Sequence, residues 1–491
     1  MLRRRSLLAT VTLVAAGGIG LAPTAAAEEV TCQNQPDGTA VCTGATTAAD
    51  GAQAPFRYEV PADWNGTLLV WSRGGPVPTP PMPGPENLRS TLLDQGYALL
   101  ASTYSRFGWA VEEGPADQMA ALDVFEAGVG RPERTIAWGG SLGGVITGAI
   151  VERFPDRIDG AIPLCHGLGG TVAQWNQLLD ATFVVDELIA TEDDLDLVDL
   201  PPFPGAAPPD ATTASALLQQ AQSTPEGRAR IALATAMNNS PLWVDPADPR
   251  PERRDLAAQQ VQMHDALQNA VRLGMGVPRQ ELEYRAGGNF SWNVDVDYRE
   301  QLQRSGHRQL VQRLYREAGL DLHADLDRLA AAPRISADPG AVDYAKAHIA
   351  PSGDLAVPVL TMNTTGDASA LASHSRTYED VVRRAGSAPM LRTTYVDAPG
   401  HCTFTAAEYL SALRTMEHRL DTGHWGSAAT PRAMNRVAEA SGVPGPARFV
   451  RYTPERLLRP CTAGRSAPGS PDRSLLRGRR RRRRPAGARD G

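Results

Sequence analysis

The stretch from Thr135 to Ile150 contains a serine flanked by glycines in a pattern that suits nucleophilic catalysis. Its sequence, TIAWGGSLGGVITGAI, predicts a strand, a tight turn that carries Ser141, and then a helix. A serine on such a turn has a strained backbone, and its hydroxyl lies above the edge of a sheet where the strands end. Glycine is needed at Gly139 and Gly143 because larger side chains would collide with the neighbouring strand and helix.

An aspartate and a histidine further along the chain fit the roles that such a serine requires. A serine hydroxyl is a weak nucleophile until an imidazole accepts its proton, and a carboxylate must orient the imidazole and stabilise its charged form. Asp367 follows a predicted strand at 357–362, and His401 follows the last predicted strand, at 391–396. Both therefore belong at the same sheet edge as Ser141.

Each of these two residues has a rival in the sequence. His166 ends the predicted strand at 160–166, next to the serine turn, but no matching acid accompanies it. Asp397 is too close to His401 along the chain for the usual geometry of an acid and a base. We therefore favour Asp367 as the acid and His401 as the base.

The motif G-x-S-x-G, followed in chain order by Asp367 and His401, resembles the catalytic triad of the α/β-hydrolase superfamily. The resemblance implies an α/β fold with a mostly parallel sheet covered by helices on both faces. It also implies that Ser141 forms an acyl-enzyme intermediate. Predicted strands alternating with helices on both sides of the serine turn agree with such a sheet.

The same resemblance implies where an oxyanion would be stabilised. In this superfamily one N–H donor belongs to the residue after the nucleophile, which is Leu142 here. The second donor comes from the backbone after an earlier strand, and Gly74 or Gly75 follows the strand predicted in 56–73. Many members have His-Gly at this point, whereas this chain has Arg73 before Gly74.

Two subgroups of the superfamily share further features with this chain. His401-Cys402 resembles tannases and fungal feruloyl esterases, in which cysteines adjoining the serine and the histidine are bridged. Gly140 precedes Ser141 here, so the bridge does not exist in that form. GGSLGG is similar to the turn that carries the nucleophilic serine, the nucleophile elbow, in secreted aminopeptidases and prolyl-oligopeptidase-like enzymes. Ester hydrolysis is therefore our first prediction, a serine peptidase the alternative, and a catalytically inactive binding protein the third reading.

The chain divides into five predicted segments. We expect a signal peptide at 1–27, the first part of the hydrolase core at 28–167, a helical lid inserted at 168–350, the second part of the core at 351–461, and a disordered arginine-rich tail at 462–491. Such an insertion at this point resembles the lid that many members of the fold have over the active site.

Amphipathic helices dominate the predicted lid. The clearest are expected at 225–237, 255–273 and 298–318. An aromatic segment between the second and third of these contains Phe290 and Trp292, which are candidates to line a substrate pocket. The alternative is that both belong to the core of the lid.

The two ends of the chain have distinct compositions. Three arginines at 3–5, an apolar run and then Ala25-Ala26-Ala27 are typical of a signal peptide, which predicts a secreted protein. The arginines do not distinguish general from twin-arginine export. Six arginines at 479–484 could give the tail a weak association with an anionic cell surface, the alternative being a solvated extension. No later run is long and apolar enough to span a membrane.

The region between these ends is acidic, because the formal charge of the whole chain is −6 although both ends are rich in arginine. This composition argues against nucleic-acid binding and leaves a small-molecule ester as the expected partner.

Acidic residues gather at 192–199 and at 321–327, where a metal site could be considered. In the second set, Leu322, Leu326 and Leu329 share one helical face, so the charges form the solvated face. We therefore expect no metal and no cofactor.

Five cysteines leave at least one without an internal partner. Cys32 and Cys42 flank a short turn and are expected to form one disulfide. Cys402 is expected to bridge to Cys165 rather than to Cys461, because both follow strands at the carboxyl edge of the sheet.

Overall fold

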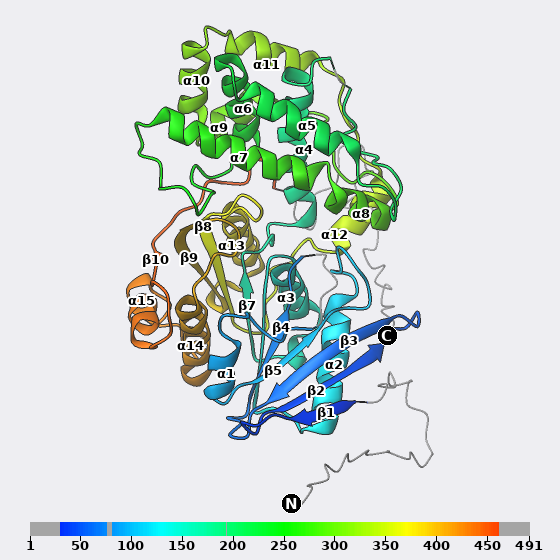
Figure 1. Ribbon diagram of the computed structural model, residues 1–491, viewed down its shortest axis with the longest axis vertical. Coiled ribbons are helices and arrows are strands. Elements are labelled where there is room, and N and C mark those ends of the chain that lie inside the picture. The colour runs from blue at the N-terminus through cyan, green and yellow to red at the C-terminus, as the bar shows by residue number, and fades with distance from the viewer. Residues whose placement is uncertain (1–29, 76–80, 193, 461–491) are drawn as a thin grey trace, which may run out of the picture.

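The computed structural model describes residues 30–75, 81–192 and 194–460. The predicted signal peptide and the arginine-rich tail, with Cys461, lie outside the described residues. The described chain forms a twisted sheet flanked by helices, with a separate group of helices above one edge of the sheet (Figure 1).

Ten strands form one sheet in the order β1-β2-β3-β5-β4-β6-β7-β8-β9-β10. The strands from β5 to β9 in this order are parallel, while β1, β2, β3 and β10 are antiparallel to their neighbours. This is the strand order of an α/β-hydrolase, and the predicted fold is confirmed. The strand bounds are β1 Thr31–Asn34, β2 Ala40–Thr47, β3 Gln53–Val60, β4 Thr67–Ser72, β5 Ala98–Ser102, β6 Arg134–Gly140, β7 Gly160–Leu164, β8 Val359–Gly366, β9 Leu391–Pro399 and β10 Phe449–Val450.

Helices cover both faces of the sheet, as the continuous burial of β4, β5, β7 and β8 requires. In β4, Leu68 and Val70 pack on one face, and Leu69 and Trp71 on the other. The first face is covered by α2 (Gly114–Gly128), α3 (Leu142–Arg153) and α13 (Ser373–Ala385); the second is covered by α1 (Arg89–Asp94), α14 (Ala406–Thr422) and α15 (Pro431–Ala440).

A helical insertion separates β7 from β8, and its described residues contain no strand. It has an apolar core of its own, to which α4, α6 and α7 contribute most. The insertion lies above the edge at which the parallel strands end (Figure 1). Its helices are α4 Thr171–Leu188, α5 Pro209–Ala221, α6 Pro225–Asn238, α7 Leu256–Gly274, α8 Val277–Ala286, α9 Tyr298–Arg304, α10 Arg308–Glu317, α11 Leu322–Ala331 and α12 Pro339–Ala347.

The segment expected to be one helix at 298–318 is two helices, so this expectation is wrong. The chain turns at residues 305–307 because polar groups there bond outside the helix. Asn239 accepts hydrogen bonds from the Ser305 hydroxyl and the Gly306 N–H, each at 3.1 Å. His307 Nε2 lies 2.6 Å from the Ser240 carbonyl oxygen. These contacts depend on the neighbouring helix α6, which the periodicity of 298–318 does not reveal.

Side chains cap the N-termini of several helices. The side chain of Thr224 caps α6 by accepting from the Gly227 N–H at 3.0 Å. Thr405 and Glu408 form a reciprocal capping box at the start of α14. In the second acidic set, Asp321 caps α11. Asp325 is buried and pairs with Arg230, so the expectation that the charges of this set are solvated is wrong for Asp325.

Two disulfides join segments of the described chain. Cys32 and Cys42 bridge the β1-β2 hairpin with their Cα atoms 4.1 Å apart. Cys165, directly after β7, bridges to Cys402 in the loop after β9, with a Cα separation of 5.4 Å. Both expected pairings are confirmed.

Among the helices of the described residues, none is sufficiently long and apolar to cross a lipid bilayer.

Candidate active site

Ser141 lies on a sharp turn between β6 and α3 with a backbone conformation of φ 59° and ψ −125°. Such positive φ values are rare for residues other than glycine and indicate local strain. A Cβ atom added at Gly139 would lie 2.4 Å from the Ser72 carbonyl oxygen, and one added at Gly143 would lie 1.9 Å from the same atom. The close packing of β4 against the turn therefore explains both glycines.

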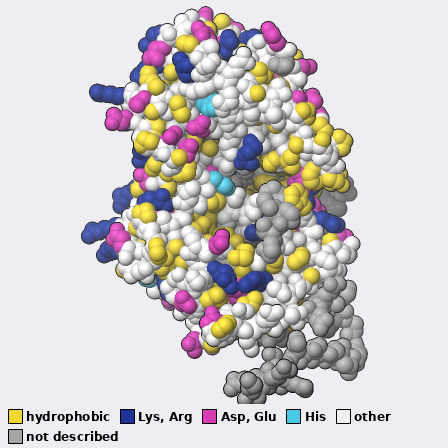
Figure 2. Space-filling model, viewed as in Figure 1, with side chains coloured by type: hydrophobic (Ala, Val, Ile, Leu, Met, Phe, Trp, Pro, Cys, Tyr) yellow, Lys and Arg dark blue, Asp and Glu magenta, His cyan; other side chains and the backbone are white. Residues whose placement is uncertain are grey.

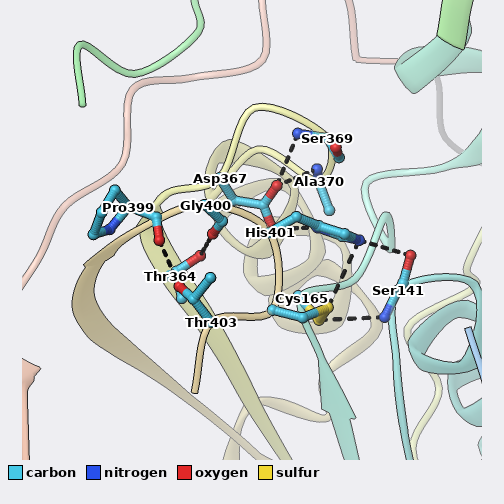
Figure 3. Close-up of a disulfide and its surroundings, with 11 residues drawn as sticks. Ser141, Cys165, Thr364, Asp367, Ser369, Ala370, Pro399, Gly400, His401 and Thr403 are labelled. Carbon is cyan, nitrogen blue, oxygen red and sulfur yellow. Dashed lines mark hydrogen bonds and ion pairs between the residues drawn. A yellow bond between two sulfur atoms is a disulfide. The ribbon is translucent and has the colours of Figure 1, made fainter. Parts of the chain in front are cut away.

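The structure brings Ser141, His401 and Asp367 together in one hydrogen-bonded chain (Figure 3). His401 Nε2 lies 2.7 Å from Ser141 Oγ, and His401 Nδ1 lies 2.7 Å from Asp367 Oδ2. The three residues come from the turn after β6, the loop after β9 and the loop after β8. Their geometry suits transfer of the serine proton to the imidazole, with the carboxylate fixing the tautomer.

Asp367 is held by its own loop. Its side chain is fully buried, and Oδ1 accepts backbone N–H groups of Ser369 and Ala370, each at 2.8 Å. The histidine loop is attached to β8 because the Gly400 N–H donates to the Gly366 carbonyl oxygen at 3.0 Å. Both partners of the histidine–aspartate pair are thus fixed by backbone contacts.

The two rival residues have other partners. Asp397 forms an ion pair with Arg250 and accepts the Thr365 hydroxyl at 3.1 Å. His166 is fully buried, where its Nδ1 accepts the Leu168 N–H at 3.1 Å.

The charge balance around His401 favours the protonated ring. Burial opposes protonation, but the negative charge of Asp367 and its hydrogen bond outweigh this effect, so the pKa of His401 lies above its usual value of 6.5. The positive charge of Arg272 acts in the opposite direction and limits the rise in the pKa.

The Cys165–Cys402 disulfide packs directly against the serine turn. The Ser141 N–H points to Cys165 Sγ at 3.3 Å, and a Cβ added at Gly140 would lie 3.5 Å and 3.6 Å from the two sulfur atoms. The bridge thus connects the turn region to the residue after His401 (Figure 3). Cys165, directly after the adjacent strand β7, is the disulfide partner that a glycine at position 140 cannot be.

The backbone after β4 approaches the serine turn closely. A Cβ added at Gly74 would lie 2.7 Å from the Gly140 carbonyl oxygen and 2.9 Å from Ser141 Cβ. Gly75 has a φ of 70° and lines the cavity beside Ser141. Arg73 fixes this segment, since it donates to the Gly75 carbonyl oxygen at 3.0 Å and to the Thr103 carbonyl oxygen at 3.0 Å.

Leu142 follows Ser141 and is the first residue of α3. N–H groups in the first turn of a helix have no partner within the helix and lie at the positive end of its dipole. Leu142 and Gly75 both line the cavity beside Ser141.

A cavity of about 280 Å³ opens in front of Ser141 and His401, between the sheet edge and the helical insertion. Its walls are mainly apolar, and two tryptophans, Trp109 and Trp175, pack edge to face with their ring centroids 6.1 Å apart. On the face shown in Figure 2, histidine and Lys/Arg side chains reach the surface near the boundary between the insertion and the sheet. The cavity is lined by Gly75, Phe107, Gly108, Trp109, Ser141, Leu142, Val145, Cys165, Gly167, Gln174, Trp175, Leu178, Arg272, Leu273, Val277, Pro278, Glu281, Ser369, Ala370 and His401.

The aromatic pair expected from the sequence lies elsewhere. Phe290 is fully buried in the core of the insertion, and Trp292 belongs to the same apolar cluster; neither lines the cavity. Phe290 packs edge to face on Trp175, with the ring centroids 5.8 Å apart, and so supports a cavity wall from behind. This position matches the alternative in which the pair is core.

Sequence reasoning missed Trp109, Trp175 and Arg272. Trp175 had a usable signal, because it lies in the first turns of the helix after β7 and so belongs near the carboxyl edge of the sheet. Arg272 lies in the last turn of α7, far from any predicted strand, and its sequence neighbours give no signal of its position.

Comparison with known proteins gives one relative by sequence. The chain is 32% identical over 428 residues to o-phthalyl amidase from Xanthobacter agilis, a match that covers 80% of this chain and 91% of that protein. No protein-family model matches the chain.

Solved structures give more distant similarities. Feruloyl esterase B from Aspergillus oryzae shares 13% sequence identity with a TM-score of 0.39, covering 82% of this chain and 88% of that one. The rice cell wall degrading esterase LipA from Xanthomonas oryzae shares 13% identity with a TM-score of 0.31, covering 80% of this chain and 90% of that one.

Proposed function

Since the chain belongs to the hydrolase family of o-phthalyl amidase, we propose that it is a serine hydrolase of carboxylic esters and amides with small aromatic acyl groups. In this proposal Ser141 is the nucleophile, His401 the general base and Asp367 the acid. The observation that carries it is the unbroken hydrogen-bonded chain from Asp367 through His401 to Ser141 at the mouth of an apolar cavity.

The proposed reaction begins when Ser141 Oγ attacks the substrate carbonyl while His401 Nε2 accepts the hydroxyl proton. The N–H groups of Leu142 and of Gly74 or Gly75 stabilise the oxyanion that forms. His401 then gives its proton to the leaving alcohol or amine, which departs and leaves an acyl-enzyme. Water, activated by His401, releases the acid and restores Ser141.

The cavity supports an aromatic acyl group. Trp109 and Trp175 provide flat apolar surfaces, and a volume of about 280 Å³ suits a single ring better than a long chain. Esters of such an acid should be cleaved faster than its amides, because an amide carbonyl is less electrophilic and its nitrogen must be protonated before it can leave, whereas an ester oxygen leaves more readily without a proton. The relationship to an amidase supports the inclusion of amides of the same acid in the proposal.

One form of the peptidase alternative, an aminopeptidase, would need a residue that the cavity does not offer among the described residues. An aminopeptidase requires a carboxylate free to bind the α-ammonium group of its substrate. Among the described residues, Glu281 is the carboxylate that lines the cavity, and it is already ion-paired with Arg285 and bonded to the Trp109 N–H at 2.8 Å. The cavity therefore favours acyl groups without an amine.

The proposal extends to the helical insertion and to the cellular location. We treat residues 168–350 as a lid because α4, α7 and α8 supply one wall of the cavity. We also propose that the protein is secreted, since two disulfides are typical of proteins that fold in an oxidising compartment.

A substrate panel tests the proposed function. We expect benzoyl and phthalyl esters and anilides to be hydrolysed, with little or no turnover of aminoacyl and prolyl amides. An uncharged fluorophosphonate should label Ser141, as peptide mapping by mass spectrometry would reveal. Aminoacyl amides that outperform every ester in kcat/KM would favour the peptidase, and a protein that takes up no label would favour an inactive binding protein.

The raised pKa of His401 predicts the pH dependence of the reaction. His401 must be neutral to accept the serine proton, so activity is present above its pKa and is lost as the pH falls through it. We therefore expect the acidic limb of kcat/KM for an uncharged ester to have its midpoint above pH 6.5, the usual value for histidine. A midpoint below that value would contradict the dominance of Asp367 in this environment.

A further inference from the structure

Among the described residues that line the cavity, Arg272 is the arginine or lysine. Three ionisable side chains line this space, namely Arg272, Glu281 and His401. Glu281 is occupied by Arg285, whereas His401 bonds to Asp367 and Ser141. Arg272 thus offers a positive charge on the same surface as the reacting groups.

The position of Arg272 is fixed from one side. Its Nη2 donates to Asn269 Oδ1 at 2.8 Å, and Asn269 in turn donates to the Ala368 carbonyl oxygen at 3.0 Å. The Ser369 hydroxyl also donates to Asn269 Oδ1, at 3.3 Å. Asn269 therefore ties the guanidinium to the loop that holds Asp367.

The remaining guanidinium donors are available to a ligand. Within the described residues Arg272 bonds to Asn269 and forms no ion pair with a carboxylate; the residue is exposed and belongs to the lining of the cavity. Arginine donors have a planar arrangement that matches two carboxylate oxygens at once. A cation in such a place, beside apolar walls, suits a ligand with a ring and a carboxylate.

We propose that Arg272 binds a carboxylate carried by the acyl part of the substrate, close to the scissile carbonyl, and thereby selects monoamides and monoesters of dicarboxylic acids. The proposal rests on the proposed function and adds the residue that sets acyl specificity. Because Arg272 lines the same cavity of about 280 Å³ as Ser141 and His401, a carboxylate bound to Arg272 shares this space with the reacting carbonyl. An ortho-substituted benzoyl group meets this requirement, whereas a meta-substituted one holds its carboxylate further away.

Arg272 also acts on His401, and this effect needs to be separated from substrate binding. Removal of the guanidinium would raise the pKa of His401 further, since its positive charge opposes protonation of the ring. That change would move the acidic limb equally for every substrate. Loss of a carboxylate contact would instead affect only substrates that carry the carboxylate.

The test compares three 4-nitroanilides, of phthalic acid, of isophthalic acid and of benzoic acid, at a pH above the acidic limb. Arg272→Gln should lower the ratio of kcat/KM for phthalyl over benzoyl substrate by roughly 30- to 100-fold, as expected for loss of a charge-assisted contact. Arg272→Lys should recover part of this ratio. Arg308→Gln, which removes an exposed arginine outside the cavity, is the matched control.

The binding of phthalate to Arg272 can be measured independently of turnover. Titration calorimetry with phthalate should give at least roughly tenfold weaker binding to Arg272→Gln than to wild-type protein, while benzamide, which has no carboxylate, should bind equally to both proteins. An unchanged phthalyl/benzoyl ratio, or equal phthalate binding by the two proteins, would overturn the role of Arg272. Failure of the fluorophosphonate to label Ser141 would instead remove the proposed function, and phthalate binding would still decide the assignment of Arg272.

Discussion

Replacing Ser141 with alanine is expected to lower kcat for any ester or amide substrate by about four orders of magnitude or more. The reason is that the serine oxygen is the attacking atom and that triad residues act as a unit, so no partial reaction remains through His401. The measurement is steady-state kinetics on a benzoyl or phthalyl ester, with fluorophosphonate labelling as a second readout. The label should disappear together with the activity.

The fold should survive this change. Ser141 Oγ bonds to His401 and supports no other element, so the unfolding temperature should stay within about 2 °C of the wild type. Ser223→Ala, at an exposed position in the insertion, is the matched control and should retain activity. If Ser141→Ala kept more than about a tenth of wild-type kcat, the nucleophile would have to be another residue.

Asp367→Asn is expected to reduce kcat by about three to four orders of magnitude. Asp367 Oδ1 accepts two backbone N–H groups, so an asparagine should keep its carbonyl oxygen there and turn its amide nitrogen toward His401 Nδ1. The ring would then accept at Nδ1 and have its proton on Nε2, facing Ser141. In that tautomer His401 cannot take the serine proton.

The matched variant for this experiment is Asp397→Asn. Asp397 pairs with Arg250 near the surface, an interaction of small energy, so the change should alter kcat by less than about threefold. Steady-state kinetics on both variants, with circular dichroism to verify folding, gives the comparison. A severe loss in Asp397→Asn beside a mild one in Asp367→Asn would reverse the assignment of the acid.

Residues near the sheet could be predicted from the sequence because their requirements are local. Gly139 and Gly143 are glycine since β4 passes within contact distance of the turn, and this constraint is visible as a short motif. The chain order of serine, acid and base follows from the order of the strands. The Cys165–Cys402 disulfide could also be predicted, because both cysteines follow strands of one parallel sheet.

The cavity walls could not be predicted in the same way. Trp109, Trp175 and Arg272 line one cavity only because the insertion packs on the sheet edge. The periodicity of apolar residues predicts helices and strands, but it does not indicate how the insertion packs on the sheet. Phe290 illustrates the same limit, since an aromatic residue in an insertion is equally compatible with a pocket and with a core. The residues at 305–307 break a helix through contacts with α6, which again are tertiary.

The position of the insertion within the sheet has a consequence for synthesis of the chain. β7 pairs with β8 through Ala161 and Val359, so the whole insertion must be made before β7 acquires its second neighbour. Until then β7 is an open, apolar sheet edge, the kind of surface on which nascent chains aggregate. We expect fragments that end before residue 359 to require chaperones to stay dispersed, and the yield of folded protein to depend on how quickly this edge is closed.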